Sequence, residues 1–275
     1  MDNNIVNNLP VECISLIISL TSPRDACRLS VVSPAFKSAA DSDTVWEKFL
    51  PPDYQQIITS NSVSSSFSSS SLLLMNSLSK KDLYFHLCNN PIPIDDGNMC
   101  FSVGKEDGKK CYMIGARALS IPLKDASAFC LWKSLPESRF AEVVELKVMW
   151  WIDVKGRIET KILSRNTTYA AYLVYKLAAE TFGFENKPVQ LSVYFEGTDE
   201  PAEKCYAAML DPAANKNSRQ FLDGAGGWME IEMGEFFVNG DDGRVVCSLF
   251  DMGGLINYKH GLIIQGIMVR PKSGC

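Results

Sequence analysis

Histidine is scarce in this 275-residue sequence, which contains only His86 and His260. Because imidazole serves many catalytic proton relays and zinc sites, such sites are hard to assemble from this chain. Nine cysteines are present, an odd number, and none is spaced as CxxC or CxxH. That pattern argues against a disulfide framework and against a zinc ribbon. We therefore predict no metal, no cofactor and free thiols in a reducing compartment, the cytoplasm or the nucleus.

An excess of basic residues is also lacking, because 27 Lys and Arg stand against 32 Asp and Glu. A mildly acidic chain has no electrostatic footprint for non-specific nucleic-acid binding and no polybasic stretch for an anionic membrane. The longest uncharged stretch, residues 54–79, is dominated by Ser, Asn and Gln, whereas a membrane span needs about 20 mostly apolar residues. No basic region or apolar run precedes Leu9, so we expect no secretory signal. The sequence predicts neither a nucleic-acid partner nor a membrane partner.

Three regimes of composition follow one another along the chain. Residues 9–50 have a helical pattern, residues 59–71 hold nine serines in thirteen positions, and a β pattern begins near residue 80. The serine run cannot bury enough apolar surface to order itself. We predict a helical domain over residues 1–52, a Ser-rich linker over 53–79 and a β domain over 80–275.

The helical regime has clear start signals. Ser22-Pro23 and Ser33-Pro34 each place an N-cap serine before a proline at the first helical position, and Pro51-Pro52 ends the last helix. About forty residues in short helices bury too little apolar surface to be stable alone. This surface is therefore expected to pack on the rest of the chain or to meet a partner.

The same region resembles an F-box. The opening Leu9-Pro10, the run Cys27-Arg-Leu-Ser-Val-Val-Ser33 and the closing Val45-Trp46 are all present, and the resemblance covers residues 9–51. It implies binding to the small Skp-family adaptor of cullin–RING ubiquitin ligases, and through that adaptor to a cullin. The candidate adaptor-binding residues are the apolar positions of the module: Leu9, Pro10, Ile14, Ile17, Ile18, Leu29, Val32 and Trp46.

The remainder of the chain has the pattern of an antiparallel sandwich, in which short apolar runs alternate with Gly, Asp and Asn. After a helical segment over residues 80–87, strands are expected at 110–115, 118–122, 142–154, 157–164, 188–195, 228–237, 244–250 and 260–269. Residues 168–179 fit a helix or a strand, and their β-branched and aromatic content favours a strand. Residues 239–243 predict a hairpin loop between two strands.

Blocks of this region resemble the plant phloem protein 2 family, or Nictaba-like lectins, over residues 110–272. They include Tyr169-Ala-Ala-Tyr172-Leu-Val, Gly227-Trp228-Met-Glu-Ile-Glu and Gln265-Gly-Ile followed by Arg270-Pro-Lys. The resemblance implies a jelly-roll-like β-sandwich, so the fold class is α+β multidomain: a small N-terminal helical F-box followed by an antiparallel sandwich. Lectins of the family bind N-acetylglucosamine oligomers or N-glycans.

The resemblance also implies where a sugar would bind. Family lectins stack sugar on two tryptophans near the start of the domain and use two acidic residues further on. Here the matching positions carry altered chemistry: Leu123, Cys130 with the nearby Trp132, Arg244 and Asp251. Losing one aromatic contact costs about 1–1.5 kcal/mol beyond area burial. The usual glycan binding is therefore expected to be absent or weakened, although Arg244 leaves a phosphate or carboxylate ligand open.

No catalytic residues are predicted. Glu230 and Glu232 lie about 6.5–7 Å apart along a strand, which glycosidase geometry permits, but a solvated strand face with Met229, Ile231 and Met233 inward is favoured. We predict a non-catalytic substrate-recognition subunit of a Skp–cullin–F-box ubiquitin ligase, with an unknown protein or glycoprotein target. The alternative is a carbohydrate-binding lectin.

Overall fold

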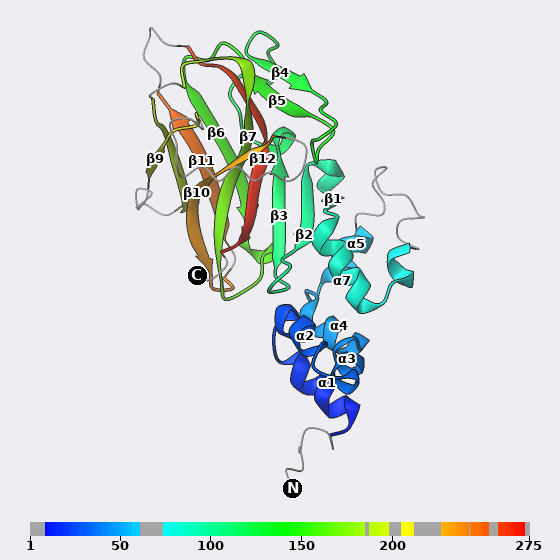
Figure 1. The fold of residues 1–275 in the computed structure, drawn as a ribbon. Helices are drawn as coiled ribbons and strands as arrows, with labels where there is room; N and C mark the ends of the chain where they lie inside the picture. The colour runs from blue at the N-terminus through cyan, green and yellow to red at the C-terminus, as the bar shows by residue number, and fades with distance from the viewer. Residues whose placement is uncertain are drawn as a thin grey trace. The chain divides into compact units, whose positions relative to one another are not determined.

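The structure is a computed structural model, and it describes residues 9–60, 74–184, 187–197, 205–211, 227–241, 243–252 and 258–272. The chain divides into two compact units (Figure 1). The first comprises Met1–Asp96 with Phe101–Lys110, and the second comprises Gly97–Cys100 with Cys111–Cys275. No helix among the described residues is long and apolar enough to span a bilayer.

The first unit is built from short helices: α1 (Val11–Ser19), α2 (Pro23–Leu29), α3 (Pro34–Ala40), α4 (Asp43–Phe49), α5 (Tyr54–Ser60) and α7 (Lys80–Asn89). The predicted caps are confirmed, because the Ser22 and Ser33 side chains accept from the backbone N–H of Asp25 and Phe36. The helix expected at 80–87 is α7. Within the predicted linker, α5 and a turn at residues 74–77 are helical, and the serine run from residue 61 lies outside the described residues.

Trp46 is the centre of the core of this unit. Its indole is fully buried and donates from Nε1 to the Ala40 carbonyl at 2.7 Å. Its ring lies 5.1 Å from the ring of Tyr84 and 5.2 Å from that of Phe85, both on α7. Helix α7 therefore completes the core of the F-box helices, which are too few to form one alone.

The turn after strand β2 (Met99–Val103) closes the same core. Tyr84 Oη donates to the Gly104 carbonyl at 2.7 Å. Gly108 has a φ of +69°, and a Cβ at this position would lie 2.2 Å from the Phe49 carbonyl oxygen. Only glycine permits both this left-handed backbone and this close approach. The turn thus holds the end of α4 through backbone contact.

The second unit is a sandwich of two antiparallel sheets (Figure 1). In the larger sheet, β12 (His260–Pro271) pairs along one edge with β7 (Thr167–Phe182) and along the other with β3 (Lys110–Gly115) and β5 (Val143–Leu146). Strand β4 (Cys130–Lys133) continues from β5, and β10 (Met229–Val238) continues from β7. The smaller sheet has the order β6 (Ile152–Glu159), β11 (Arg244–Asp251), β8 (Val189–Phe195) and β9 (Tyr206–Ala208). The short β1 (Ile92–Ile94) pairs with β2 where the chain passes between the units.

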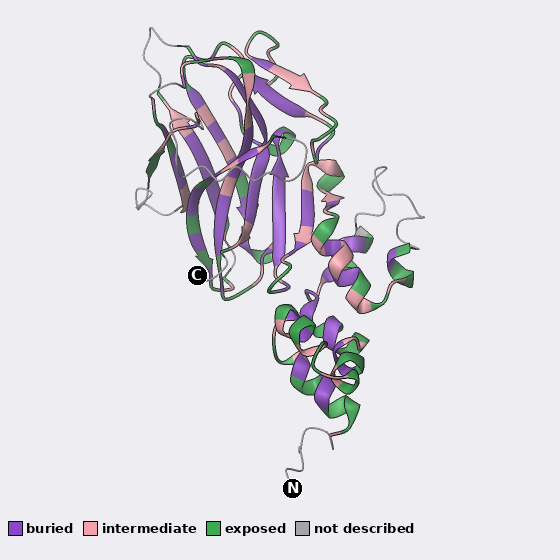
Figure 2. Ribbon diagram, viewed as in Figure 1, coloured by how far each residue is buried: buried purple, intermediate pink, exposed green. Residues whose placement is uncertain are grey.

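Buried residues run along the central strands of both sheets (Figure 2). Tyr169, Leu173 and Tyr175 of β7 are fully buried, as are Val154 of β6 and Leu249 of β11. Strand β6 alternates, since Ile152, Val154, Gly156 and Ile158 are buried and the residues between them are not, so one of its faces lines the core. Residues 245–249 of β11 are buried at every position. The strand expected at 168–179 is confirmed as part of β7, and the antiparallel sandwich is confirmed as the fold.

Several expected boundaries are corrected. Residues 118–122 are not a strand, because a 3₁₀ turn covers Ala116–Ala118 and Ser120 makes one isolated bridge. The strands expected at 142–154 and 157–164 are instead β5 and β6, separated by residues 147–151. Residues 239–243 are not a hairpin loop, since β10 and β11 belong to different sheets. Within that loop, residue 242 lies outside the described residues.

Candidate functional site

Large aliphatic side chains are exposed on the F-box helices although the core beneath them is complete. We call this group the aliphatic set. Its most exposed members are Leu20, with 81% of its surface accessible, and Val31, with 85%. Isolated exposed aliphatics are ordinary, but five within a few turns of one small module indicate an interaction surface. The set consists of Leu16 and Ile17 of α1, Leu20 at the C-cap of α1, and Val31 and Val32 after α2.

The structure divides the eight predicted adaptor-binding residues into two groups. Ile14, Ile18 and Trp46 are buried in the core of the unit, so they support the module rather than present a surface. The other five reach the surface: Pro10, Ile17 and Val32 are exposed, while Leu9 and Leu29 are half-buried.

Three members of the aliphatic set, Leu16, Leu20 and Val31, were not among the predicted residues. A helical wheel of α1 contains the missing signal. At 100° per residue, Leu16 and Leu20 project opposite Ile14 and Ile18, while Ile17 lies about 60° from Ile14, at the border between the two faces. The helix therefore has an apolar face toward the core and a second apolar face toward solvent.

Exposed cations occur on α2 and α3, whereas α1 carries the exposed Glu12. Arg24 and Arg28 of α2 and Lys37 of α3 are exposed, and among these Arg28 lies 3.6 Å from Asp25. Two acidic residues of the F-box form ion pairs with α7 instead. Asp41 lies 2.5 Å from Lys81 Nζ, and Glu47 lies 3.1 Å from Lys80 Nζ. A partner with an acidic rim around an apolar surface would complement this arrangement.

The residues that match the family's sugar-stacking positions do not offer open aromatic faces. Leu123 is exposed in the loop before β4, whereas Cys130 is buried within β4. The pKa of the Cys130 thiol is raised, chiefly because the thiol is buried. Trp132 donates from Nε1 to the Lys124 carbonyl at 3.0 Å, and the Arg117 guanidinium lies 3.6 Å from its ring centroid. That stacked cation covers one face of Trp132.

The structure does not bring Arg244 and Asp251 together. They occupy the two ends of β11, so about 23 Å of strand separates them at 3.3 Å per residue. Arg244 donates to Glu159 at 2.7 Å and to Glu196 at 3.0 Å, and these two carboxylates raise its pKa. Asp251 forms an ion pair with the fully buried Lys259. The two residues therefore belong to separate ion-pair networks.

The candidate glycosidase pair also belongs to an ion-pair network. Glu230 binds Arg270 at 2.8 Å, and the Arg270 guanidinium lies 4.1 Å from the ring centroid of Tyr172. Glu232 lies on the same strand face, 3.8 Å from Lys272. Met229, Ile231 and Met233 are buried, as the favoured interpretation predicts. The solvated face is found at Glu232 but not at Glu230, whose side chain is 11% exposed beside Arg270.

Comparison with known families finds the description "F-box domain" over residues 6–48 and "Phloem protein 2" over residues 109–271. Two similar proteins come from Arabidopsis thaliana. The F-box protein PP2-B10 is 39% identical over 270 residues, which cover 96% of this chain and 93% of that protein. The F-box protein SKIP3 is 37% identical over 281 residues, covering 98% and 89%.

Among solved structures, a family 35 carbohydrate-binding module from Clostridium thermocellum matches 58% of this chain and 96% of its own, with a TM-score of 0.32 and 9% identity. The CBM22-1 xylan-binding domain from Paenibacillus barcinonensis matches 58% and 90%, with a TM-score of 0.30 and 9% identity. With TM-scores of 0.32 and 0.30 and 9% identity, these two matches support no statement about this chain. With both domains in this order and relatives matched over most of their length, the chain belongs to the plant F-box proteins that carry a phloem protein 2 domain.

Proposed function

We propose that this protein is the substrate-recognition subunit of a Skp–cullin–F-box ubiquitin ligase. Its F-box helices bind a Skp-family adaptor, which in turn binds a cullin, while the phloem protein 2 domain holds a protein or glycoprotein target. The observation that carries the proposal is that the aliphatic set stays exposed although α7 completes the core of the F-box helices. The cytoplasm or the nucleus is the proposed location.

Burial energetics support the adaptor interface. Fully burying one Val, Leu or Ile side chain contributes about 1.5–3 kcal/mol, so burial of the five members of the aliphatic set can supply the apolar core of an interface. The exposed Arg24, Arg28 and Lys37 add electrostatic steering toward an acidic partner. The protein does no chemistry itself, and its contribution to ubiquitin transfer is to raise the effective concentration of target lysines.

Size-exclusion chromatography of the full chain with purified adaptor and cullin tests this proposal. We expect one ternary complex, and we expect Ile17→Asp with Val31→Asp to leave this protein in a separate peak. Leu74→Asp is the matched control, because Leu74 is an exposed aliphatic residue of the same unit outside the F-box helices. No complex with the unaltered chain, or an unchanged complex with the double variant, would refute the proposed role.

The alternative function is binding of N-acetylglucosamine oligomers or N-glycans. The burial of Cys130, the stacking of Arg117 on Trp132 and the separation of Arg244 from Asp251 weigh against it at the family positions. A glycan array probed with the full chain distinguishes the two functions. Micromolar binding to chitooligosaccharides would favour the lectin as the target-binding activity.

A further inference from the structure

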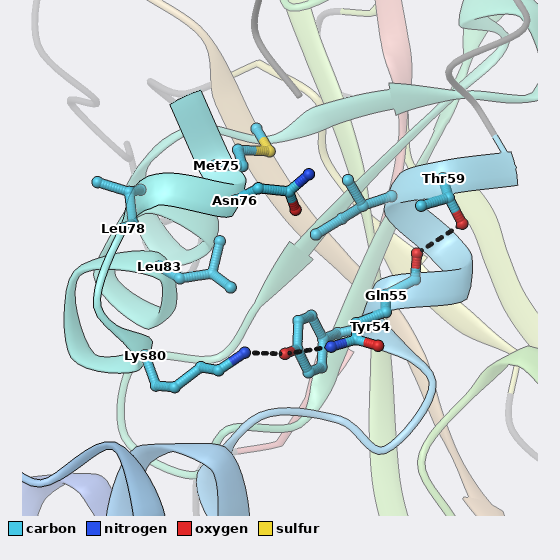
Figure 3. A pocket seen from close by; sticks show the side chains of 9 residues that line it. Tyr54, Gln55, Thr59, Met75, Asn76, Leu78, Lys80 and Leu83 are labelled. Atoms are coloured by element: carbon cyan, nitrogen blue, oxygen red, sulfur yellow. Dashed lines mark hydrogen bonds between the residues drawn. The ribbon is translucent and has the colours of Figure 1, made fainter. Parts of the chain in front are cut away.

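The first unit contains a cavity of about 260 Å³ between α5 and α7, and polar side chains of its lining bind one another (Figure 3). Tyr54 Oη accepts from Lys80 Nζ at 2.5 Å and from Gln55 Nε2 at 3.0 Å. The Thr59 hydroxyl donates to the Gln55 carbonyl at 2.8 Å. Contacts of this kind within the lining specify no ligand. A larger groove, of about 490 Å³, lies in the second unit and has a lining of different character.

This groove, which we call the edge groove, lies between β9 of the smaller sheet and β10 of the larger sheet. Within the described residues, β9 pairs with β8 alone and β10 pairs with β7 alone, so each is an edge strand of its sheet (Figure 1). Half of the backbone N–H and C=O groups of such a strand point away from its partner. An edge of this kind is a template for a further strand. The described lining of the edge groove is Tyr206, Ala207, Ala208, Met209, Ile231, Glu232, Gly234 and Glu235.

Small residues on both sides of the edge groove cover little of the backbone. On β9 these are Ala207 and Ala208, and on β10 the small residue is Gly234. Gly234 has a φ of +148°, and a Cβ at this position would lie 3.2 Å from the Cβ of Val193 on β8. The register of β10 against β7 shifts between Glu232 and Gly234. Because a bulge interrupts a strand's regular ladder, β9 is the more regular of the two edges.

Tyr206 shows that the hydrophobic core reaches this edge without being covered. Tyr206 is paired with Leu191 of β8, and directly opposed residues of an antiparallel pair lie on the same face of the sheet. Leu191 is fully buried, whereas 44% of the surface of Tyr206 is accessible. Ile231, which is paired with the fully buried Leu173, lines the edge groove from β10. A strand added to β9 would therefore cover Tyr206 and direct every second side chain toward Tyr206 and Ile231.

The charge in the edge groove is negative. Among the lining residues that the structure describes, only Glu232 and Glu235 are charged. Lys272 forms an ion pair with Glu235 and lies 3.8 Å from Glu232. Two carboxylates against one ammonium give these three side chains a net negative charge, and each of them is more than a third exposed. The solvent-directed side chains of an added strand would pass beside Glu232 and Glu235, so basic residues would be complementary there.

We propose that the edge groove binds an extended segment of the target protein, which joins β9 as a further strand of the smaller sheet. Apolar residues of the segment alternate with Lys or Arg. The apolar side chains lie against Tyr206 and Ile231, and the cations lie beside Glu232 and Glu235. The inference rests on the proposed function for the identity of the partner as a target, but binding of the segment does not require the adaptor.

Methyl-detected NMR of the full chain, labelled at alanine and isoleucine methyl groups, tests the proposal with the peptide acetyl-Lys-Val-Lys-Val-Lys-amide. We expect saturable shifts at Ala207, Ala208 and Ile231 and none at Ile17, which belongs to the first unit. The peptide with Glu in place of each Lys should bind at least about tenfold more weakly, which corresponds to about 1.4 kcal/mol. No saturable shift with the lysine peptide, or equal affinity for the glutamate peptide, would overturn the proposal.

N-methylated forms of the lysine peptide test strand pairing. Successive residues of a strand direct their N–H groups to opposite edges, so methylating the valines or the lysines blocks opposite edges of the peptide. At least one of the two forms should bind at least about tenfold more weakly. Full affinity of both forms would contradict pairing with β9. Shifts of the same three methyl signals on dilution of the chain without peptide would show that a second copy covers this edge, which would also overturn the proposal.

Variants test the charge selection. Glu232→Gln with Glu235→Gln should weaken the lysine peptide by at least about threefold, because exposed charge pairs contribute modestly. Glu142→Gln is the matched control, since Glu142 is 40% exposed, binds Arg117 and does not line the edge groove. Unchanged binding by the double variant would contradict the proposal.

The adaptor complex is measured on the same double variant by size-exclusion chromatography, and we expect it to form. Peptide binding by a chain that forms no adaptor complex would refute the ligase role and support the edge groove. An adaptor complex without peptide binding would refute the edge groove alone.

Discussion

At the residue scale, the sequence identifies Trp46 as part of an F-box but does not predict which residues bury its side chain. The closing Val45-Trp46 pair identifies an F-box, but the side chain is buried against Tyr84 and Phe85 instead of being presented to an adaptor. Its covering residues lie almost forty positions later, beyond a serine run, so no local period could reveal them. Ile17 and Val32 were predicted as adaptor-binding residues and are exposed, Ile17 on α1 and Val32 in the turn after α2. Helical periodicity did not predict this, since it groups Ile17 with the buried Ile14 and Ile18 and places Val32 inward.

Trp46→Ala is expected to destabilise the first unit by about 3–5 kcal/mol, since it removes a large buried ring and leaves the Ala40 carbonyl without its donor. Chemical denaturation followed by tyrosine and tryptophan fluorescence measures the change. Ile17→Asp, at an exposed position, should alter stability by less than about 0.5 kcal/mol. Equal losses for the two variants would mean that Trp46 is not the centre of the core.

Gly108→Ala is a second test at this scale. The new Cβ would meet the Phe49 carbonyl oxygen at 2.2 Å, in addition to the strain of a φ of +69°. Gly97→Ala is the control, because its φ of +84° carries similar strain while no atom lies within 4 Å of the added carbon. We expect about 1–2 kcal/mol for the control and a larger loss for Gly108. A smaller loss for Gly108 would show that the turn moves away from α4.

At the element scale, local sequence patterns predict single helices and strands well, but they do not predict which strands pair. The Ser-Pro starts of α2 and α3 and the β-branched content of β7 were sufficient to predict them. The turn after β10 was not, because β11 joins the smaller sheet through pairing with β6 and β8, which lie some fifty to ninety residues earlier. The separation of Arg244 from Asp251 follows from the length of the same strand, which was expected at residues 244–250.

The packing of α7 against Trp46 predicts which fragments of the first unit fold cooperatively. Residues 9–52 lack the α7 side of the Trp46 core, so we expect this fragment to show little helix and no cooperative unfolding by circular dichroism. Residues 9–110 include α7 and the turn at 104–108, and this fragment should unfold cooperatively. A cooperatively folded 9–52 fragment would contradict the role given to α7.

At the scale of the whole molecule, the two units divide the work of the proposed function. The first presents aliphatic side chains beside exposed cations, so association with an acidic-rimmed adaptor should slow as salt rises, because screening weakens steering. Stopped-flow association rates at increasing ionic strength measure this effect. Arg24→Glu with Lys37→Glu should lower the rate at low salt and flatten its salt dependence. An unchanged slope would show that these cations do not face the partner.

The most direct test of the central claim is calorimetry of the full chain with a purified Skp-family adaptor. The aliphatic set predicts clear binding by the unaltered chain, and Ile17→Asp with Val32→Asp should weaken it by at least about a hundredfold while the melting temperature is kept. Leu74→Asp should bind as the unaltered chain does. Absence of binding by the unaltered chain, or full affinity in the folded double variant, would contradict the account.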